Sequence, residues 1–172
     1  MRALTATLLV LTLLFAAACG SKSSTASAPS GGASVQATTP AKTIHFAKTK
    51  FLLHAGLAFG AFHRYVYKPF KAGAFSHPLQ HKLALLKAAA AALFVVHEVR
   101  IAREDAQASA LLRKLFSPLT ALAATVGGVA AGLKAGHVDS GSLTSANGAV
   151  ESIKKRASAA GAPVTEHTPP PP

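Results

Sequence analysis

The chain has 172 residues, of which 18 are Lys or Arg and only six are Asp or Glu, so its formal net charge is +12 at pH 7. So few carboxylates leave little material for acid–base catalysis or for coordination of hard metal ions. The single cysteine, Cys19, has no internal partner for a disulfide, so the core alone must hold the fold.

The N-terminal stretch has the pattern of a secretory signal. Residues 3–18 are uncharged and mostly apolar, follow Arg2, and end in three alanines. This run is 16 residues long, and a membrane-spanning helix needs about 20. The pattern therefore favours a cleaved signal over a permanent transmembrane anchor.

Cys19 lies directly behind that run, in the sequence AAACGS of residues 16–21. These residues resemble the lipobox of bacterial lipoprotein precursors, with Ala16 where lipoboxes favour Leu. The resemblance covers residues 1–21 and implies that residues 1–18 are removed, that Cys19 carries a thioether-linked diacylglycerol, and that the new N-terminus is acylated, for example with palmitate. It implies a protein anchored to the extracytoplasmic face of the cell membrane. The alternative is an ordinary secretory signal that leaves Cys19 as a free thiol.

Two low-complexity segments frame the remaining chain. Residues 19–43 contain the lipidated Cys and a linker rich in Ser, Thr, Gly and Pro, which we expect to be a flexible tether. As a random coil, its 24 residues after Cys19 would span about 27 Å. Residues 161–172, GAPVTEHTPPPP, are predicted to be a disordered, solvated tail with polyproline character. Residues 44–160 are enough for one helical domain. Removal of residues 1–18 would delete Arg2 and no acid, which leaves a net charge of +11.

The first helix is expected to run from about residue 44 to residue 67. Its apolar positions at helical spacing are Ile44, Phe51, Ala55, Ala58, Phe62 and Tyr65. Nearly every position between Phe51 and Phe62 is apolar, which predicts burial on more than one side. Gly56 and Gly60 form a small-residue face that lets another backbone approach closely. We expect Pro69 and Gly73 to end the helix.

The second helix is expected to begin in SHPLQHK, residues 76–82, with Ser76 or His77 as the cap and Pro78 in the first turn. Its predicted buried stripe consists of Leu79, Leu83, Leu86, Ala90, Leu93 and His97. The stripe fades after His97 and resumes at residue 111. Either one helix continues to residue 116, over about 57 Å, or it bends near residues 104–105.

A third helix is predicted to start with Ser117 as cap and Pro118 as first residue, and to end near Gly136. Residues 115–133 carry no charge and reach the length of a membrane span, but their Ala, Thr and Gly content favours a helix packed in a soluble bundle. Ala124, Gly128, Gly132 and Gly136 recur four residues apart, which predicts close packing of another backbone on this face.

A fourth helix is expected to begin at Ser140 or Ser142 and to stop at Gly161 and Pro163. Its predicted buried stripe is Leu143, Ala146, Val150, Ile153, Ala157 and Ala160. The fold class is therefore all-α, an antiparallel helical bundle of about four helices preceded by a flexible tether.

The sequence contains no phosphate-binding glycine loop and no nucleophile elbow, and we predict a non-enzymatic protein without a cofactor. His77 and His81 have the four-residue spacing of ligands on one helical face, and His97 lies on the predicted stripe. These three residues are weak candidates for an alternative function, an extracytoplasmic protein that binds metal or haem through helical histidines. Pro78 places His77 at a cap, and a hydrogen-bonded histidine is the commoner outcome.

No Asp or Glu occurs before Glu98, which points to an anionic neighbour. For an exported protein we expect anionic phospholipids or cell-wall polymers, with a protein partner as a further option, and no nucleic acid. The segment RYVYKPFK interleaves cations and rings and is the predicted contact surface, through Arg64, Tyr65, Tyr67, Lys68, Phe70 and Lys71. In the alternative interpretation the rings close the core and the cations only face water.

Overall fold

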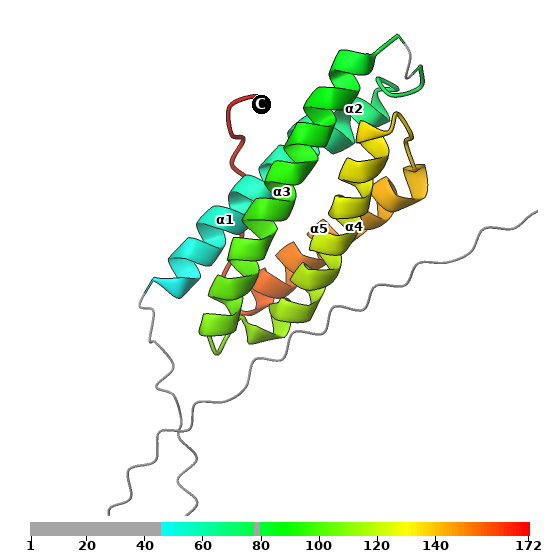
Figure 1. The fold of residues 1–172 in the computed structure, drawn as a ribbon. Coiled ribbons are helices and arrows are strands. Elements are labelled where there is room, and N and C mark those ends of the chain that lie inside the picture. The colour runs from blue at the N-terminus through cyan, green and yellow to red at the C-terminus, as the bar shows by residue number, and fades with distance from the viewer. Residues whose placement is uncertain (1–45, 78–79) are drawn as a thin grey trace, which may run out of the picture. The chain divides into compact units, whose positions relative to one another are not determined.

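The computed structural model describes residues 46–77 and 80–172, which form an antiparallel helical bundle (Figure 1). The α-helices are α1 (Ala47–Ala61), α2 (Lys68–Lys71), α3 (Lys82–Ala108), α4 (Phe116–Lys134) and α5 (Ser140–Ala159), together with a π-helical segment η1 (Phe62–Tyr67) and a 3₁₀ turn η2 (Arg113–Leu115). No β-strand occurs in these two ranges. The expected fold class is confirmed. The predicted signal, Cys19 and the linker lie outside the described residues.

The first helix continues beyond the predicted stop at Pro69. The backbone N–H of Lys68 donates to the carbonyl of His63, five residues back, which is the hydrogen-bond step of a π-helix. Pro69, which has no N–H to donate, follows directly as the second residue of α2. The helical run ends at Lys71, four residues beyond the predicted end at residue 67, with Ala72 as its C-cap. Gly73 follows with a positive φ of 73°.

The buried face of α3 is different from the predicted one. Leu83, Leu86 and Leu93 are 67%, 59% and 50% exposed, and Ala90 and His97 are exposed as well. The buried positions are instead Leu85, Ala88, Ala89, Ala91, Ala92, Val95, Val96, Val99, Ala102 and Ala106. The reason is that α3 packs against both α1 and α4, and small Ala and Val side chains allow both neighbours to approach closely.

The end of α3 follows neither of the two predicted alternatives. The helix stops at Ala108, because Ser109 has an extended backbone with φ −107° and ψ 122°. A turn and η2 then lead into α4. No side chain caps α4, and the predicted cap Ser117 and first residue Pro118 lie one and two residues inside its first turn.

The hydrophobic core is continuous through the bundle. Its largest fully buried side chains include Phe51, Phe59, Phe62, Leu112, Leu119, Leu122, Leu133, Leu143 and Ile153. The stripe predicted for α5 is buried from Leu143 to Ala157, with Ala160 half-buried. The cap of α5 is Asp139, whose side chain accepts hydrogen bonds from the backbone of Gly141 and Ser142.

The uncharged stretch predicted as a possible membrane span is α4. Within Arg113–Lys134, an 18-residue window has the length and composition of a spanning helix, with a mean hydropathy of 1.5, and 39% of that window is buried in the bundle. One side of α4 packs on α3 and α5. Its small-residue face meets other backbone at Gly132, where a Cβ would lie 2.9 Å from the carbonyl oxygen of His137. Ala124 and Gly128 are exposed, and a Cβ on Gly128 would meet nothing within 4 Å. The close packing predicted for this face is therefore wrong at these two positions.

Candidate functional site

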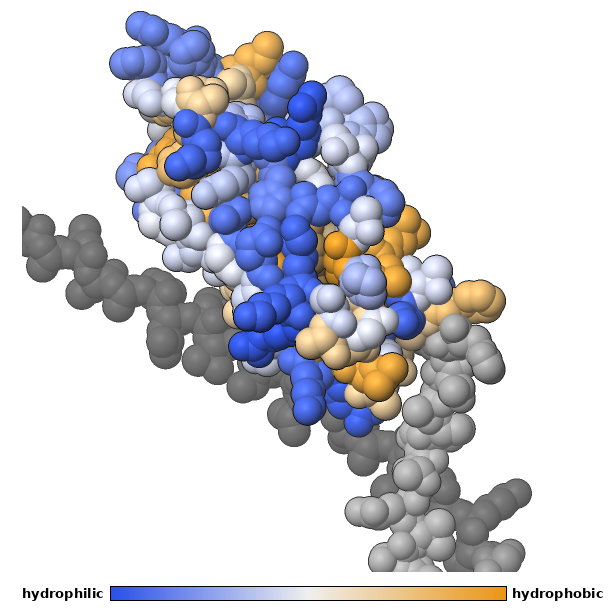
Figure 2. All heavy atoms as spheres, turned by 180° about the vertical axis from the view of Figure 1, so that it is seen from behind, coloured by the Kyte–Doolittle hydropathy of each residue, from blue (hydrophilic) through white to orange (hydrophobic). Residues whose placement is uncertain are grey.

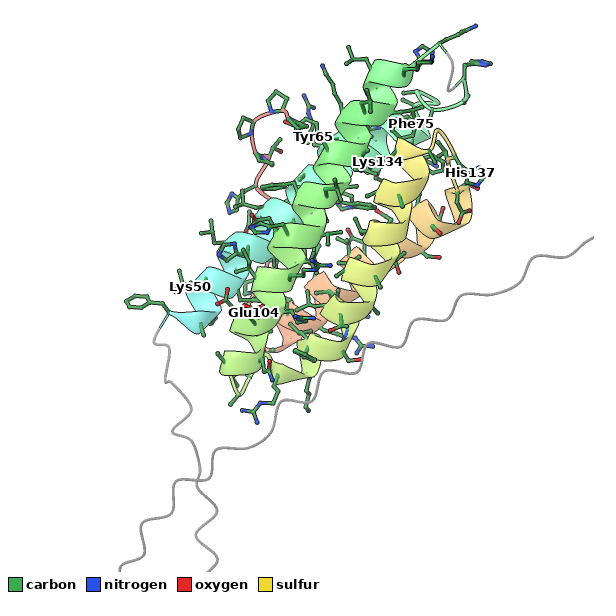
Figure 3. All side chains as sticks on the ribbon, viewed as in Figure 1. Lys50, Tyr65, Phe75, Glu104, Lys134 and His137 are labelled. Carbon is green, nitrogen blue, oxygen red and sulfur yellow. The ribbon has the colours of Figure 1, made fainter. Side chains whose placement is uncertain are left out.

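The C-terminal segment lies along α1 (Figure 1). The backbone N–H of His167 donates to the carbonyl of Gly56 at 3.0 Å. The Tyr65 hydroxyl donates to the carbonyl of Pro169 at 2.7 Å, and Tyr65 lies beside the end of the tail (Figure 3). These two contacts contradict the prediction that residues 161–172 form a solvated, disordered tail.

The tail can approach α1 closely because two glycines lie beneath it. A Cβ on Gly56 would overlap the carbonyl oxygen of Thr165, and a Cβ on Gly60 would overlap the backbone of His167. The small-residue face predicted on the first helix is thus used, and its occupant is the end of the same chain. We call the surface formed by Gly56, Gly60, His63, Tyr65 and Lys154 the tail groove.

A polar cluster at one side of the tail groove holds the carboxylate of Glu166. His63 Nδ1 lies 2.8 Å from Glu166 Oε2, and Lys154 Nζ donates to Glu166 Oε1 at 2.6 Å. The other ring nitrogen, His63 Nε2, is 2.9 Å from Asn147 Oδ1. Lys154 also donates to Glu151 at 3.3 Å. Both ring nitrogens of His63 therefore lie within hydrogen-bond distance of a side-chain oxygen.

Charge in this cluster is balanced internally. Burial favours a higher pKa for Glu166, but the hydrogen bonds from Lys154 and His63 outweigh it and hold the pKa below its usual value. The hydrogen bond to Glu166 likewise raises the pKa of Lys154. The cluster therefore favours an ionised Glu166 that is hydrogen-bonded to Lys154 and His63, which ties the tail to η1 and α5.

The same cluster has the donor types of a metal site. One ligand atom each from His63, Glu151 and Glu166 can be chosen so that all lie within 4.8 Å of one another. However, Lys154 Nζ hydrogen-bonds to both carboxylates, and a divalent cation would have to displace this ammonium. These residues fit an ion network closed by Lys154 better than a metal centre.

The histidines proposed from the sequence are arranged differently. His77 precedes α3, His81 is the residue at its N-cap, and His97 lies in its third quarter; all three are exposed. Along a helix, His81 and His97 are about 24 Å apart, so the structure does not bring the three together. The sequence pattern does not predict the cluster of His63, Glu151 and Glu166. These residues come from three separate segments, and none of the segments has the spacing of metal ligands.

A second cluster of polar side chains lies between α1 and α3. His54 Nδ1 is 2.7 Å from Glu98 Oε2, and Glu98 is buried. Asp105 is also buried, and burial raises its pKa, against the opposing effect of His54 and Lys50. Lys50 and Glu104 mark this end of the bundle in Figure 3. The pairing of His54 with Glu98 is a structural contact between two neighbouring helices.

The segment predicted to contact an anionic surface has its rings and cations on different sides. Tyr65, Tyr67 and Phe70 are half-buried and pack against the core, and the Tyr67 ring stacks on Phe62. The cations of the segment are exposed; they are Arg64, Lys68 and Lys71. The rings therefore serve the core, as in the alternative interpretation, while the three cations remain available to a partner.

No family model, curated protein or solved structure matches this chain.

Proposed function

We propose that this protein is a lipid-anchored component of the bacterial cell envelope, and that its basic helical domain docks on anionic membrane. The observation that carries the proposal is the exposed face of α3, which we call the α3 face. It consists of Leu83, Leu86 and Leu93 together with the exposed cations Lys82, Lys87 and Arg100.

The α3 face has the composition of an interfacial helix. Its three leucines lie three and seven residues apart, on one side of the helix, and at least half of each is exposed. Large exposed apolar side chains with flanking cations suit the boundary between lipid headgroups and acyl chains. On the side of the molecule opposite to the view of Figure 1, a band of hydrophilic residues runs along the bundle with apolar patches beside it (Figure 2).

The charges of the domain support an anionic partner. Most carboxylates in residues 46–77 and 80–172 are held by other groups: His54 binds Glu98, Lys154 binds Glu151 and Glu166, and Asp139 caps α5. Among lysines and arginines of the same ranges, only Arg103 and Lys154 lie within 4.0 Å of a carboxylate. The remaining cations are free to attract anionic lipid, at about 1 kcal/mol each when close to the surface.

The lipid on Cys19 complements this surface in the proposal. Stable membrane attachment usually requires two signals, such as acyl chains together with a basic surface. The acyl chains would keep the domain near the membrane, and the α3 face would then orient it.

Vesicle binding by unlipidated protein that begins at Gly20 tests the docking surface. We expect binding to vesicles of anionic lipid, weak binding to neutral vesicles, and loss of binding as salt screens the charges. Replacing Leu83, Leu86 and Leu93 by Ser should reduce the partition constant at least tenfold. Leu111→Ser is the matched control, since Leu111 is 66% exposed outside the α3 face.

A second set of variants separates the two basic surfaces. Gln in place of Lys82, Lys87 and Arg100 should reduce anionic binding by about two orders of magnitude, at about 1 kcal/mol for each cation. The same change at Arg64, Lys68 and Lys71 should have a smaller effect. The reverse order would assign docking to residues 64–71. Equal binding to neutral and anionic vesicles would contradict membrane docking and favour a wall polymer or a protein partner.

The alternative function, extracytoplasmic metal or haem binding, is supported by the proximity of His63, Glu151 and Glu166 and opposed by the position of Lys154. Elemental analysis and an absorption spectrum of the purified, dialysed protein test it. Stoichiometric metal or a haem band would establish it.

A further inference from the structure

The floor of the tail groove consists of two glycines, which leave room for a peptide backbone to lie against α1. Gly56 and Gly60 are buried beneath the tail, and a methyl group at either position would overlap backbone atoms of Thr165 or His167. Glycine costs a helix interior up to about 1 kcal/mol relative to alanine. Two such residues one turn apart give α1 a channel in which the backbone of the tail lies closer than any side chain at these positions would allow.

Within the channel, the hydrogen bonds are made to the backbone of the tail and not to most of its side chains. The Gly56 carbonyl accepts from the N–H of His167, and the Tyr65 hydroxyl donates to the carbonyl of Pro169. The side chains of Thr165, His167 and Thr168 are exposed. Any extended peptide with an N–H and a carbonyl at these two positions meets the same partners.

Glu166 is the tail residue whose side chain is hydrogen-bonded to side chains of the bundle. The carboxylate of Glu166 receives Lys154 on one oxygen and His63 on the other. Beyond it, Pro169, Pro170 and Pro172 line a small apolar pocket of about 190 Å³ with Tyr65 and Phe94. Prolines hold the segment extended before it binds, which lowers the entropy lost on binding.

We propose that the tail groove is a peptide-binding site whose resident ligand is the chain's own C-terminal segment, and that it accepts in trans an extended peptide carrying a carboxylate followed three residues later by a proline. This inference is independent of membrane docking, because it uses α1, η1, α5 and Phe94 of α3, and none of the residues of the α3 face. The covalent link keeps the resident segment at high local concentration, so a competing peptide binds only when that segment is released.

The test releases the resident segment and returns it as a separate peptide. A site for a specific protease is inserted between Ala162 and Pro163 of the full chain, the folded protein is cut, and the freed segment is removed by dialysis. A fluorescent peptide with the sequence of residues 163–172 is then titrated by anisotropy. We expect saturable binding, and at least about tenfold weaker binding for the peptide in which Gln replaces Glu166, because a hydrogen-bonded carboxylate is lost.

Variants of the cut protein identify the site. Gly60→Ala should weaken binding of the same peptide at least about tenfold by blocking the channel. Gly128→Ala is the matched control, since a Cβ there meets nothing within 4 Å, and it should leave the affinity unchanged. Absence of saturable binding, or equal affinity of the Gly60→Ala protein, would overturn the proposal.

A measurement on the uncut chain keeps the proposal testable if the insertion disturbs folding. In Gly60→Ala a non-specific protease should remove the tail several-fold faster than in the parent and in Gly128→Ala, because the blocked channel releases it. Equal rates in all three proteins would also overturn the proposal.

Discussion

Glu166 is the residue whose charge connects the C-terminal segment to the rest of the bundle. Its carboxylate bridges His63 and Lys154, and these hydrogen bonds lower its pKa in spite of partial burial. A depressed pKa in the folded state means that the ionised form stabilises the fold. This contribution is fully present above the usual pKa of 4.5 and is lost as the pH falls through the lower folded value.

We therefore predict that Glu166→Gln lowers the free energy of unfolding by about 1 kcal/mol at pH 7, a modest value because the ion pairs are partly solvated. The difference between variant and parent should shrink below about pH 4.5 and vanish at lower pH. Urea denaturation across this range measures it. Glu104→Gln is the control, because Glu104 is 70% exposed and should show no such pH dependence.

Asp105 behaves in the opposite way. Burial raises its pKa, and its Oδ2 atom has no hydrogen-bond partner among the described residues. The contribution of Asp105 to stability is favourable below its usual pKa of 3.8 and is lost as the pH rises through the raised value. An ionised, desolvated carboxylate therefore destabilises the bundle at neutral pH.

Asp105→Asn should accordingly raise the free energy of unfolding by about 1 kcal/mol at pH 7, and the gain should fade below pH 4. Chemical denaturation at the two pH values checks this. A loss of stability at pH 7 would show that attraction of the carboxylate to His54 and Lys50 outweighs its desolvation.

At the scale of elements, α3 shows how alanine positions set the spacing of a bundle. Ala92 is fully buried between neighbouring helices, whereas Ala90, two residues earlier, is exposed. Extra methyl groups in a packed interface cost about 1–3 kcal/mol, and surface changes usually stay within about 0.5 kcal/mol. We predict that Ala92→Leu destabilises the protein by 1–3 kcal/mol while Ala90→Leu leaves it nearly unchanged, as thermal denaturation would show. Equal effects would mean that α3 is loosely packed.

The same helix explains why part of the fold could be predicted and part could not. In α5 the apolar residues occur on one side only, so their spacing identified the buried face. In α3 apolar residues surround the helix between residues 83 and 96. The predicted buried stripe followed the leucines, and these lie on the exposed side. Periodicity does not distinguish a buried alanine face from an exposed leucine face when both are apolar.

The candidate site was harder to predict from the sequence than the fold. His63 and Glu166 are separated by 103 residues, and the tail has the composition of a disordered segment. The glycine pair on α1 was a usable signal, since it predicted close approach of a backbone. It did not identify that backbone, because the contact depends on where the end of α5 directs the chain.

At the scale of the whole molecule, the anchor remains a prediction from the sequence. Cys19→Ala should abolish incorporation of a labelled fatty acid and leave the protein either unprocessed or released from the membrane fraction, because the thiol is the only attachment point for a thioether lipid. Metabolic labelling and detergent partitioning measure both effects. If parent and variant label and partition alike, Cys19 is not lipidated.

The tail on α1 also has a consequence for the order of folding. Residues 165–169 follow every helix of the bundle in the chain and contact the first of them, so the channel over Gly56 and Gly60 stays open while the helices are synthesised. Contacts between distant parts of a chain tend to form late, after local helices. The bundle should therefore assemble first and be closed by its C-terminus in a separate final step. A C-terminal tag or a premature stop acts on that step, and leaves α1 with an exposed backbone channel at the moment when other chains are nearby.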